Sequence, residues 1–313
     1  MSDKPAKRYI ANRYQVQEGL GRGGIGKVYR VYDHQTGREL ALKMLRTQWV
    51  NNDQAVSRFL REMETVKRLD HPGIVKVYDT HREGNQIFYT MEYVRGKTLR
   101  AWLNQRGRLD LGSAVRVLCL VAHALEHAHR ITIHRDLSPE NVMILRDGSV
   151  RLLDFGLAKI ADAEQVLTMV GASLGKLQYV APEQRTDAAK VDHRADIYSL
   201  GIIFFEMLTG QRPDMKHSLL ELRPDLHVIC QDFLSKATAA HPHQRFQSAR
   251  ELRQALLRIY EQAQAGEAPR LGQAGYNTTA PRPWQVRAFL YHWWAMAAAW
   301  GWGRLRRHTL RKP

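Results

Sequence analysis

The sequence predicts an α+β fold with two lobes, a small β-rich lobe followed by a larger α-helical lobe. Residues 14–45 alternate apolar and polar side chains between glycines, which is typical of short strands joined by turns. From Leu99 onward the apolar residues follow a helical period, and the stretches 111–130 and 197–208 read as long apolar helices.

The region between these two patterns is expected to complete the first lobe. Residues 53–69 place Phe59 and Met63 on one helical face, and residues 74–78 and 87–94 are strand-like. A chain of 313 residues is long enough to bury one large core or two lobes.

Cysteine usage and the N-terminus predict a cytoplasmic protein. Cys119 and Cys230 are far apart and have neither metal-binding nor redox spacing, which indicates two core thiols in a reducing compartment. Residues 1–12 are polar and lysine-rich, without the apolar run of a secretory signal.

The formal net charge is +16, and residues 264–313 contribute eight basic residues against the single acid Glu267. Strongly basic proteins often bind nucleic acid. No nucleic-acid-binding module is recognisable, so we expect no nucleic-acid partner. The basic patches are expected to attract acidic lipids, phosphates or acidic protein partners.

The first chemical motif is a glycine-rich run. Residues 21–28 read GRGGIGKV, a G-x-G-x-x-G-x-V pattern whose missing side chains allow backbone N–H groups to approach phosphates. The pattern alone also fits a hairpin turn, or the dinucleotide-binding fingerprint, which continues as a helix. Here residues 28–31 continue as a strand, which favours a phosphate-binding loop between two strands.

Lys43 ends an apolar strand that follows this loop. A surface lysine is the simpler interpretation, and the functional one is an ammonium group on nucleotide phosphates that is paired with a helical carboxylate. Glu62 in the predicted helix 53–69 is the expected partner, because helical geometry turns its competitor Glu64 about 200° away.

The most specific motif is HRDLSPEN at residues 134–141. Phosphoryl transfer needs a carboxylate beside the attacking hydroxyl and an oxygen ligand for a metal ion, and Asp136 and Asn141 have the required spacing. Asp154, followed by Phe155 and Gly156, comes directly after a predicted strand and supplies a second metal ligand. An Ala-Pro-Glu triplet at residues 181–183 closes the segment.

Five such motifs in the correct order resemble the eukaryotic-like (Hanks-type) protein kinases, most closely the bacterial serine/threonine kinases. The resemblance covers residues 12–262 and includes HPGIV at 71–75, the hinge MEYV at 91–94 and HPHQRF at 241–246. It implies the two-lobed kinase fold and transfer of the γ-phosphate of ATP to serine or threonine hydroxyls of protein substrates.

The resemblance also implies roles for single residues. Asp136 would orient the substrate hydroxyl and accept its proton, while Lys43 and Glu62 would position the phosphates. Asn141 and Asp154 would bind Mg²⁺, with Mn²⁺ as an alternative. The remaining nucleotide contacts would come from the glycine loop, the adenine pocket and the hinge: Leu20, Gly21, Gly23, Gly26, Val28, Ala41, Met91, Glu92, Val94 and Met143.

Further family contacts concern structure and regulation. Arg245 would pair with Glu183, and Asp196 would cap the catalytic loop from a buried helix. Arg135 precedes the catalytic aspartate, so phosphorylation between Asp154 and Glu183 would supply it with an anion. Thr168 and Ser173 are the hydroxyl residues expected to receive that phosphate.

Two positions depart from the family pattern. Ser138 replaces the usual lysine of the catalytic loop, and Lys176 replaces the usual threonine before Ala-Pro-Glu. In the family both positions adjoin the catalytic aspartate. One hypothesis is an exchange, in which Lys176 supplies the catalytic charge and Ser138 bonds Asp136. The other is decay to an ATP-binding pseudokinase scaffold at the membrane, although Lys43 and the remaining catalytic residues are all retained.

Other transferases fit less well. A small-molecule kinase of the aminoglycoside type needs no peptide platform such as residues 154–183. A tyrosine kinase would have an alanine- and arginine-rich catalytic loop where this chain reads LSPE at residues 137–140.

We divide the chain into an N-lobe with the glycine loop (1–94), a C-lobe with the catalytic and activation loops (95–262), a linker (263–283) and a tail (284–313). The tail is rich in tryptophan and ends with basic residues. Its apolar stretch 288–303 spans about 24 Å as a helix, short of the roughly 30 Å hydrocarbon core.

Three arrangements of the tail remain open. Tryptophan and arginine favour an interfacial anchor on the anionic inner face of the cell membrane. A short C-terminal span and packing against the kinase lobe are the alternatives. Dimerisation is also left open by the sequence.

Overall fold

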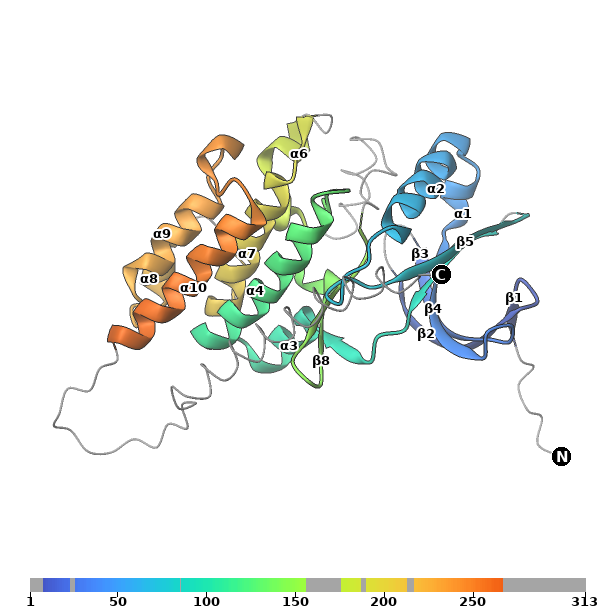
Figure 1. Cartoon of the computed structure of the whole chain (residues 1–313), viewed down its shortest axis with the longest axis horizontal. Coiled ribbons are helices and arrows are strands. Elements are labelled where there is room, and N and C mark those ends of the chain that lie inside the picture. Colours follow the sequence, from blue (N-terminus) through green and yellow to red (C-terminus); the bar gives the residue numbers. More distant parts are fainter. Residues whose placement is uncertain are drawn as a thin grey trace, which may run out of the picture. The chain divides into compact units, whose positions relative to one another are not determined.

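The computed structural model describes residues 8–22, 26–84, 86–155, 176–186, 190–212 and 217–266, all within one compact unit that extends to Glu267. The sequence-based expectations for Gly23, Gly156, Thr168, Ser173 and the tail 284–313 lie outside these residues. Both predicted lobes are covered, and the elements follow the chain from a β-sheet to a group of helices (Figure 1).

An antiparallel sheet of six strands, in the order β1-β2-β3-β4-β6-β5, builds the first lobe. Two helices, α1 and α2, accompany it (Figure 1). The bounds are β1 Tyr9–Ile10, β2 Tyr14–Arg22, β3 Gly26–Asp33, β4 Arg38–Leu45, α1 Thr47–Val50, α2 Asp53–Lys67, β5 Val77–Glu83 and β6 Gln86–Glu92.

Strand β4 separates two environments because successive side chains of a strand point to opposite faces. Leu42 and Met44 lie on one face, in or against a small apolar core with Tyr14 and Phe88. Lys43 lies on the other face. The alternation therefore assigns one face of the sheet to packing and the other to the chemistry described below.

Helix α2 begins where the sequence provides a cap. The side chain of Asn52 accepts a hydrogen bond from the N–H of Ala55, which satisfies one of the free donors of the first turn. Its buried face includes Phe59, Met63 and Val66, spaced three or four residues apart. This spacing fixes which side of the helix meets the sheet and leaves Glu62 on a neighbouring side.

The second lobe is mostly helical, with a small antiparallel sheet β7-β8-β9 at its start. The bounds are β7 Gly96–Thr98, α3 Leu99–Arg106, α4 Leu111–Ala128, η1 Pro139–Asn141, β8 Val142–Leu145, β9 Val150–Leu152, η3 Leu177–Tyr179, α6 Pro182–Thr186, α7 Arg194–Thr209, α8 Leu219–Leu222, α9 Val228–Ala237, η5 Pro242–Gln244 and α10 Ala249–Gly266.

Helix α4 packs against α7 and α10 at the centre of this lobe (Figure 1). Among the described residues, α4 is also the one helix long and apolar enough to cross a membrane, but half of that stretch is buried within the protein. Its apolar character is therefore explained by its place in the core.

The predicted elements are present with shifted ends. Residues 74–76 make an isolated bridge between Ile74 and Leu152, and strand β5 follows from Val77. Helix α7 starts at Arg194 and ends at Thr209, and the capping residue Gly210 has a φ of 73°, a left-handed conformation that suits glycine. Helix α10 continues to Gly266, past residue 262 at which the sequence analysis ended the C-lobe.

A buried ion pair joins two distant parts of the second lobe. Arg245 is 1% exposed, and its guanidinium donates to both carboxylate oxygens of Glu183, at 2.6 and 2.8 Å. It also donates to the backbone carbonyls of Ala239, Ala240 and Arg194. The pair predicted from the sequence is confirmed, and it ties the start of α6 to the segment before α10.

We expect Arg245→Met to lower the free energy of unfolding by about 3–5 kcal/mol, because it leaves a partly buried carboxylate and three carbonyls without their partner. Urea denaturation measures the loss. Arg258→Met, an exposed arginine of α10, is the matched control and should change stability by no more than about 0.5 kcal/mol. Equal effects of the two substitutions would contradict this assignment.

Candidate active site

The site is built on an aspartate of the buried helix α7. Asp196 is fully buried, and its Oδ1 and Oδ2 accept hydrogen bonds from the backbone N–H groups of Arg135 (2.8 Å) and His134 (2.9 Å). His129 Nε2 lies 2.8 Å from Oδ2. The predicted cap on the catalytic loop is confirmed.

These bonds hold an unfavourable backbone conformation in place. Arg135 has a φ of 66°, which a residue with a long side chain rarely adopts. Burial would raise the pKa of the Asp196 carboxyl, but the hydrogen bond and charge of His129 lower it below its ordinary value. The carboxylate therefore stays ionised and keeps accepting the two N–H groups that hold the turn.

Asp136 follows this turn and receives two partners. Asn141 Nδ2 donates to Asp136 Oδ2 at 3.0 Å and to its backbone carbonyl at 2.6 Å. Lys176 Nζ lies 3.0 Å from Asp136 Oδ2 and 3.4 Å from Oδ1. About a third of each of the Asp136 and Lys176 side chains remains exposed. The pair thus holds a charged carboxylate at an accessible position.

Lys176 is a cation in this setting. Burial by itself would lower the pKa of its ammonium group, but the charge and hydrogen bonding of Asp136 raise it above the ordinary value. Asp154 adds to the same effect. At neutral pH the ammonium group is therefore fully protonated.

The expected hydrogen bond from Ser138 to Asp136 is wrong. Ser138 is 1% exposed and makes no hydrogen bond to Asp136, whereas its hydroxyl helps to lower the pKa of the neighbouring Glu140 carboxyl. A serine reaches only one atom beyond Cβ, whereas the long stem of Lys176 crosses to Asp136 from another part of the chain. Half of the hypothesised exchange is therefore present, namely the lysine.

Lys43 makes the second ion pair of the site. Its Nζ lies 2.6 Å from Asp154 Oδ2, and the hydroxyl of Tyr89 donates to Oδ1 at 3.0 Å. Burial would raise the pKa of Asp154, but Lys43 and Tyr89 lower it, so this carboxyl is also ionised. Strand β4, strand β6 and the segment after β9 meet at this group.

Lys43 has a partner that the sequence did not predict, namely Asp154. The pair of Lys43 with Glu62 of α2 stays a prediction. The left-handed backbone at Asp154, with a φ of 58°, brings that largely buried carboxylate to Lys43. A buried carboxylate requires a cation, and Lys43 is the one that reaches it.

An apolar floor supports these polar groups. Phe155 is 2% exposed, and its ring lies 4.5 Å from that of His134, measured between centroids. Burial lowers the pKa of His134, whose Nε2 lies 2.8 Å from the carbonyl oxygen of Leu153. His134, which precedes the turn at Arg135, is thus held by packing against Phe155 as well as by a polar contact.

Known proteins share this arrangement. The protein kinase domain model matches residues 14–266. The chain belongs to the protein kinase family. Its members use ATP and a divalent metal ion to phosphorylate proteins.

Several curated relatives of this kinase are bacterial proteins. It is 34% identical over 259 residues to serine/threonine-protein kinase PrkC of Bacillus subtilis, covering 78% of this chain and 40% of PrkC. It is 34% identical over 310 residues to PknB of Mycobacterium tuberculosis, covering 88% of this chain and 48% of PknB. The chain thus spans less than half the length of these relatives.

Solved structures agree with the fold. The crystal structure of the PknI kinase domain of Mycobacterium tuberculosis superimposes with a TM-score of 0.67 at 31% identity. The match covers 82% of this chain and 100% of that one. The two-lobed protein kinase fold predicted from the sequence is confirmed.

The nucleotide residues predicted for this kinase lie mainly on one apolar cluster. Ala41 and Val94 are buried in it, with Val28 and Met143 packed against them. Leu20 in β2 stands apart and is 40% exposed. The other predicted positions are Gly21 in β2, Gly26 in β3, and Met91 and Glu92 in β6.

The site's oxygen ligands fit a small divalent metal ion. Asn141 uses its amide nitrogen on Asp136, so its amide oxygen is left for another partner, and Asp154 supplies an ionised carboxylate. The described residues contain no group of three or more histidine, cysteine or acidic side chains placed to hold a metal. Mg²⁺ needs no such cage, because it is usually held by one or two protein ligands together with substrate phosphates.

Sequence reasoning missed three contributors to the site. Tyr89 bonds Asp154, His129 bonds Asp196, and Gln184 Nε2 donates to the carbonyl of Arg135 at 2.9 Å. A tyrosine on a buried strand does signal that its hydroxyl needs a partner. The identity of that partner depends on chain segments that meet only in the fold.

Gly26 is required by strand packing. A Cβ at this position would lie 2.2 Å from the backbone oxygen of Met44, whereas a Cβ on Gly21 would meet nothing within 4 Å. Gly26 and Met44 are on adjacent, directly paired strands, so neither can move without opening the β3–β4 ladder.

We expect Gly26→Ala to lower the free energy of unfolding of the nucleotide-free kinase by about 1–3 kcal/mol, as at other overpacked sites. Gly21→Ala is the matched control and should leave that stability within about 0.5 kcal/mol of the parent. Thermal denaturation without nucleotide compares them. If both variants melt like the parent, the close approach of the strands is not what requires Gly26.

Proposed function

We propose that this kinase transfers the γ-phosphoryl group of ATP to serine or threonine hydroxyls of protein substrates. The observation that carries the proposal is the environment of Asp136, which is a partly exposed carboxylate oriented by Asn141 and paired with Lys176. The names of PrkC and PknB, which describe serine/threonine-protein kinases, support the choice of hydroxyl.

Asp136 would accept the proton of the attacking hydroxyl. The bond from Asn141 fixes one of its oxygens, which orients the carboxylate before a substrate arrives. The expected Mg²⁺, held by Asn141 and Asp154, would neutralise charge on the phosphates. Lys43 would contact the phosphates beside Asp154, and its pairing with Glu62 stays a prediction.

Lys176 would take over the work of the lysine that the family usually has at position 138. Its ammonium already lies beside the carboxylate where negative charge on the transferring group would develop. A fixed cation at that point acts mainly on the transition state. Its pKa lies above the ordinary lysine value, so it would be charged at neutral pH.

We expect Lys176→Ala to reduce kcat about 10²–10³-fold with little change in ATP binding, because the lost charge faces the transferring phosphoryl group. Single-turnover phosphorylation of a serine/threonine peptide measures the rate. Lys236→Ala, an exposed lysine of α9, is the matched control and should behave like the parent. Asp136→Asn provides the inactive background.

A second pair of variants tests the exchange itself. Ser138→Lys with Lys176→Thr should recover much of the rate, because one ammonium group then adjoins Asp136 again. Ser138→Lys alone should help less, since two ammonium groups would crowd one phosphate. A Lys176→Ala enzyme as fast as the parent would refute the catalytic role of Lys176. An inactive parent with an active double variant would favour the pseudokinase scaffold.

We further propose that the tail 284–313 holds the kinase at an anionic membrane surface. The supporting observation is the sequence, in which five tryptophans precede a basic end. Tryptophan favours the headgroup zone, and each basic residue near an anionic surface contributes about 1 kcal/mol.

Removing this charge should release the full-length kinase from anionic vesicles if the tail lies on the surface. The five residues to replace by glutamine are Arg304, Arg306, Arg307, Arg311 and Lys312. Flotation with and without high salt measures binding, because salt weakens only the surface mode. A charge-free variant that still floats in high salt would favour a spanning tail.

A further inference from the structure

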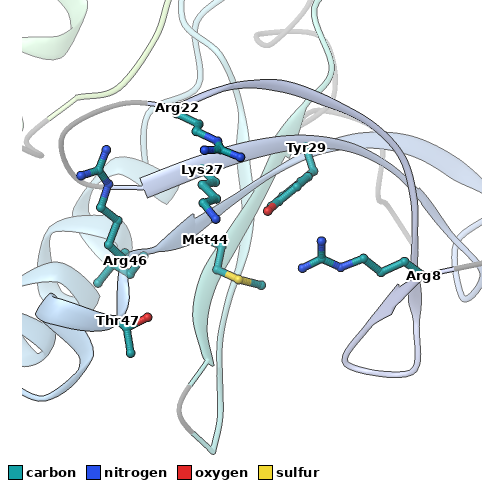
Figure 2. Close-up of a pocket in the computed structure, with 8 residues that line it drawn as sticks. Arg8, Arg22, Lys27, Tyr29, Met44, Arg46 and Thr47 are labelled. Carbon is teal, nitrogen blue, oxygen red and sulfur yellow. The ribbon is translucent and has the colours of Figure 1, made fainter.

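The face of the first-lobe sheet opposite Lys43 contains a cavity of about 510 Å³. Its walls come from the start of the described chain, the end of β2, the start of β3, and the end of β4 with the residues that follow. The lining residues are Arg8, Arg22, Lys27, Tyr29, Met44, Leu45, Arg46 and Thr47. Figure 2 shows Arg8 reaching toward Met44 from the side opposite Arg46.

Charge is the distinctive property of this cavity. Arg8, Arg22, Lys27 and Arg46 line it, and none of its eight lining residues is acidic. Some other arginines of the lobe have carboxylate partners, for example Arg13 with Asp33 at 2.7 Å and Arg30 with Glu18 at 3.1 Å. Among the ion pairs of the described residues, none involves any of the four cations of the cavity.

The four cations surround an apolar floor. Tyr29 and Met44 are partly buried and pack against the small apolar core that contains Tyr14 and Phe88. Arg8 lies over the ring of Tyr29, with its guanidinium carbon 5.5 Å from the ring centroid. A ligand for this cavity therefore combines an anionic group with a short apolar stem.

We propose that this cavity binds phosphorylated serine or threonine side chains of protein segments. A phosphate monoester carries close to two negative charges and three acceptor oxygens at neutral pH. Arginine forks match that geometry with paired hydrogen bonds. The side-chain carbons and neighbouring backbone of a peptide would lie on Tyr29 and Met44.

A peptide suits the cavity better than a membrane does. A bilayer presents a broad surface, whereas these cations line a hollow that a protruding side chain can enter. This inference rests on the proposed function in one respect. Phosphoserine and phosphothreonine, the ligands proposed for the cavity, would be the products of that reaction. Binding one phosphorylated residue would raise the effective concentration of further hydroxyls of the same protein near the enzyme.

The cavity can be tested apart from catalysis. Lys43 and Met44 are neighbours on β4 and point to opposite faces of the sheet, so the cavity and the catalytic site lie on different sides. Arg8 and Arg46 are exposed and belong to no catalytic or nucleotide contact. Replacing them removes charge from the cavity without altering the site around Asp136.

The experiment measures fluorescence anisotropy of a short labelled alanine peptide with one phosphothreonine at its centre, using the full-length kinase. The parent should bind it and should not bind the same peptide with threonine. Arg8→Gln combined with Arg46→Gln should weaken binding at least about tenfold, because each charged hydrogen bond lost carries a penalty of this order.

Arg38→Gln, an exposed arginine at the other end of β4, is the matched control and should bind like the parent. Phosphorylation of a peptide without phosphate should be equally fast in all three proteins, which shows that they are folded.

Three results would overturn the proposal. The parent could bind the phosphorylated and unphosphorylated peptides equally, or bind neither. The double variant could bind the phosphopeptide as tightly as the parent. Finally, it could lose binding to vesicles of anionic lipid while its phosphopeptide binding is unchanged, which would make the cavity a membrane contact.

Discussion

The buried carboxylate of Asp196 is the contact on which the catalytic geometry depends. It accepts two consecutive backbone N–H groups and thereby holds Arg135 in a left-handed conformation. Without those bonds the turn would relax toward the extended or helical region, and Asp136 would leave its position. Because Asp196 belongs to the well-packed helix α7, the strain in the loop is balanced by the packing of the lobe.

The ammonium group beside Asp136 reaches this loop from another part of the chain. Lys176 comes directly before η3, and Tyr179 at the end of η3 is tied to a buried polar cluster. Arg100 of α3 donates to the hydroxyl of Tyr179 at 2.7 Å and to Glu206 of α7 at 2.6 Å. Burial would lower the pKa of Arg100, but Glu206 raises it, so the cluster keeps its cation.

The position of Lys176 in the sequence determines which contacts its ammonium group depends on. In the usual family arrangement the lysine lies two residues after the catalytic aspartate, so its charge is always present there. In this kinase the ammonium beside Asp136 belongs to the segment that begins at Lys176. If Lys176 has the role proposed for it, the contacts of Tyr179 that anchor η3 also help to position the charge.

Because successive side chains of a strand point to opposite faces, the first-lobe sheet has a different site on each face. Lys43 faces Asp154, while its neighbour Met44 lines the basic cavity on the opposite face. The two sites share strands, but no side chain belongs to both of them. A ligand on the outer face would thus meet the same sheet that positions the nucleotide residues without competing for them.

The sequence by itself determined the lobes, the order of the elements and the positions of the catalytic motifs. These follow from local rules, since apolar periods define helices and strands, and phosphoryl transfer requires particular side chains at particular spacings. The sequence also predicted the pair of Arg245 and Glu183 and the cap by Asp196, through the resemblance of their motifs to a family.

Only the tertiary structure decided which groups meet across long sequence distances. Lys43 pairs with Asp154, Ser138 is buried without a hydrogen bond to Asp136, and Gly26 is needed because the backbone of Met44 approaches it closely. None of these contacts has a local signature, because each depends on the packing of strands and loops that are far apart in the chain. The basic cavity is a feature of the same kind, since Arg8 and Arg46 become neighbours only when the sheet has formed.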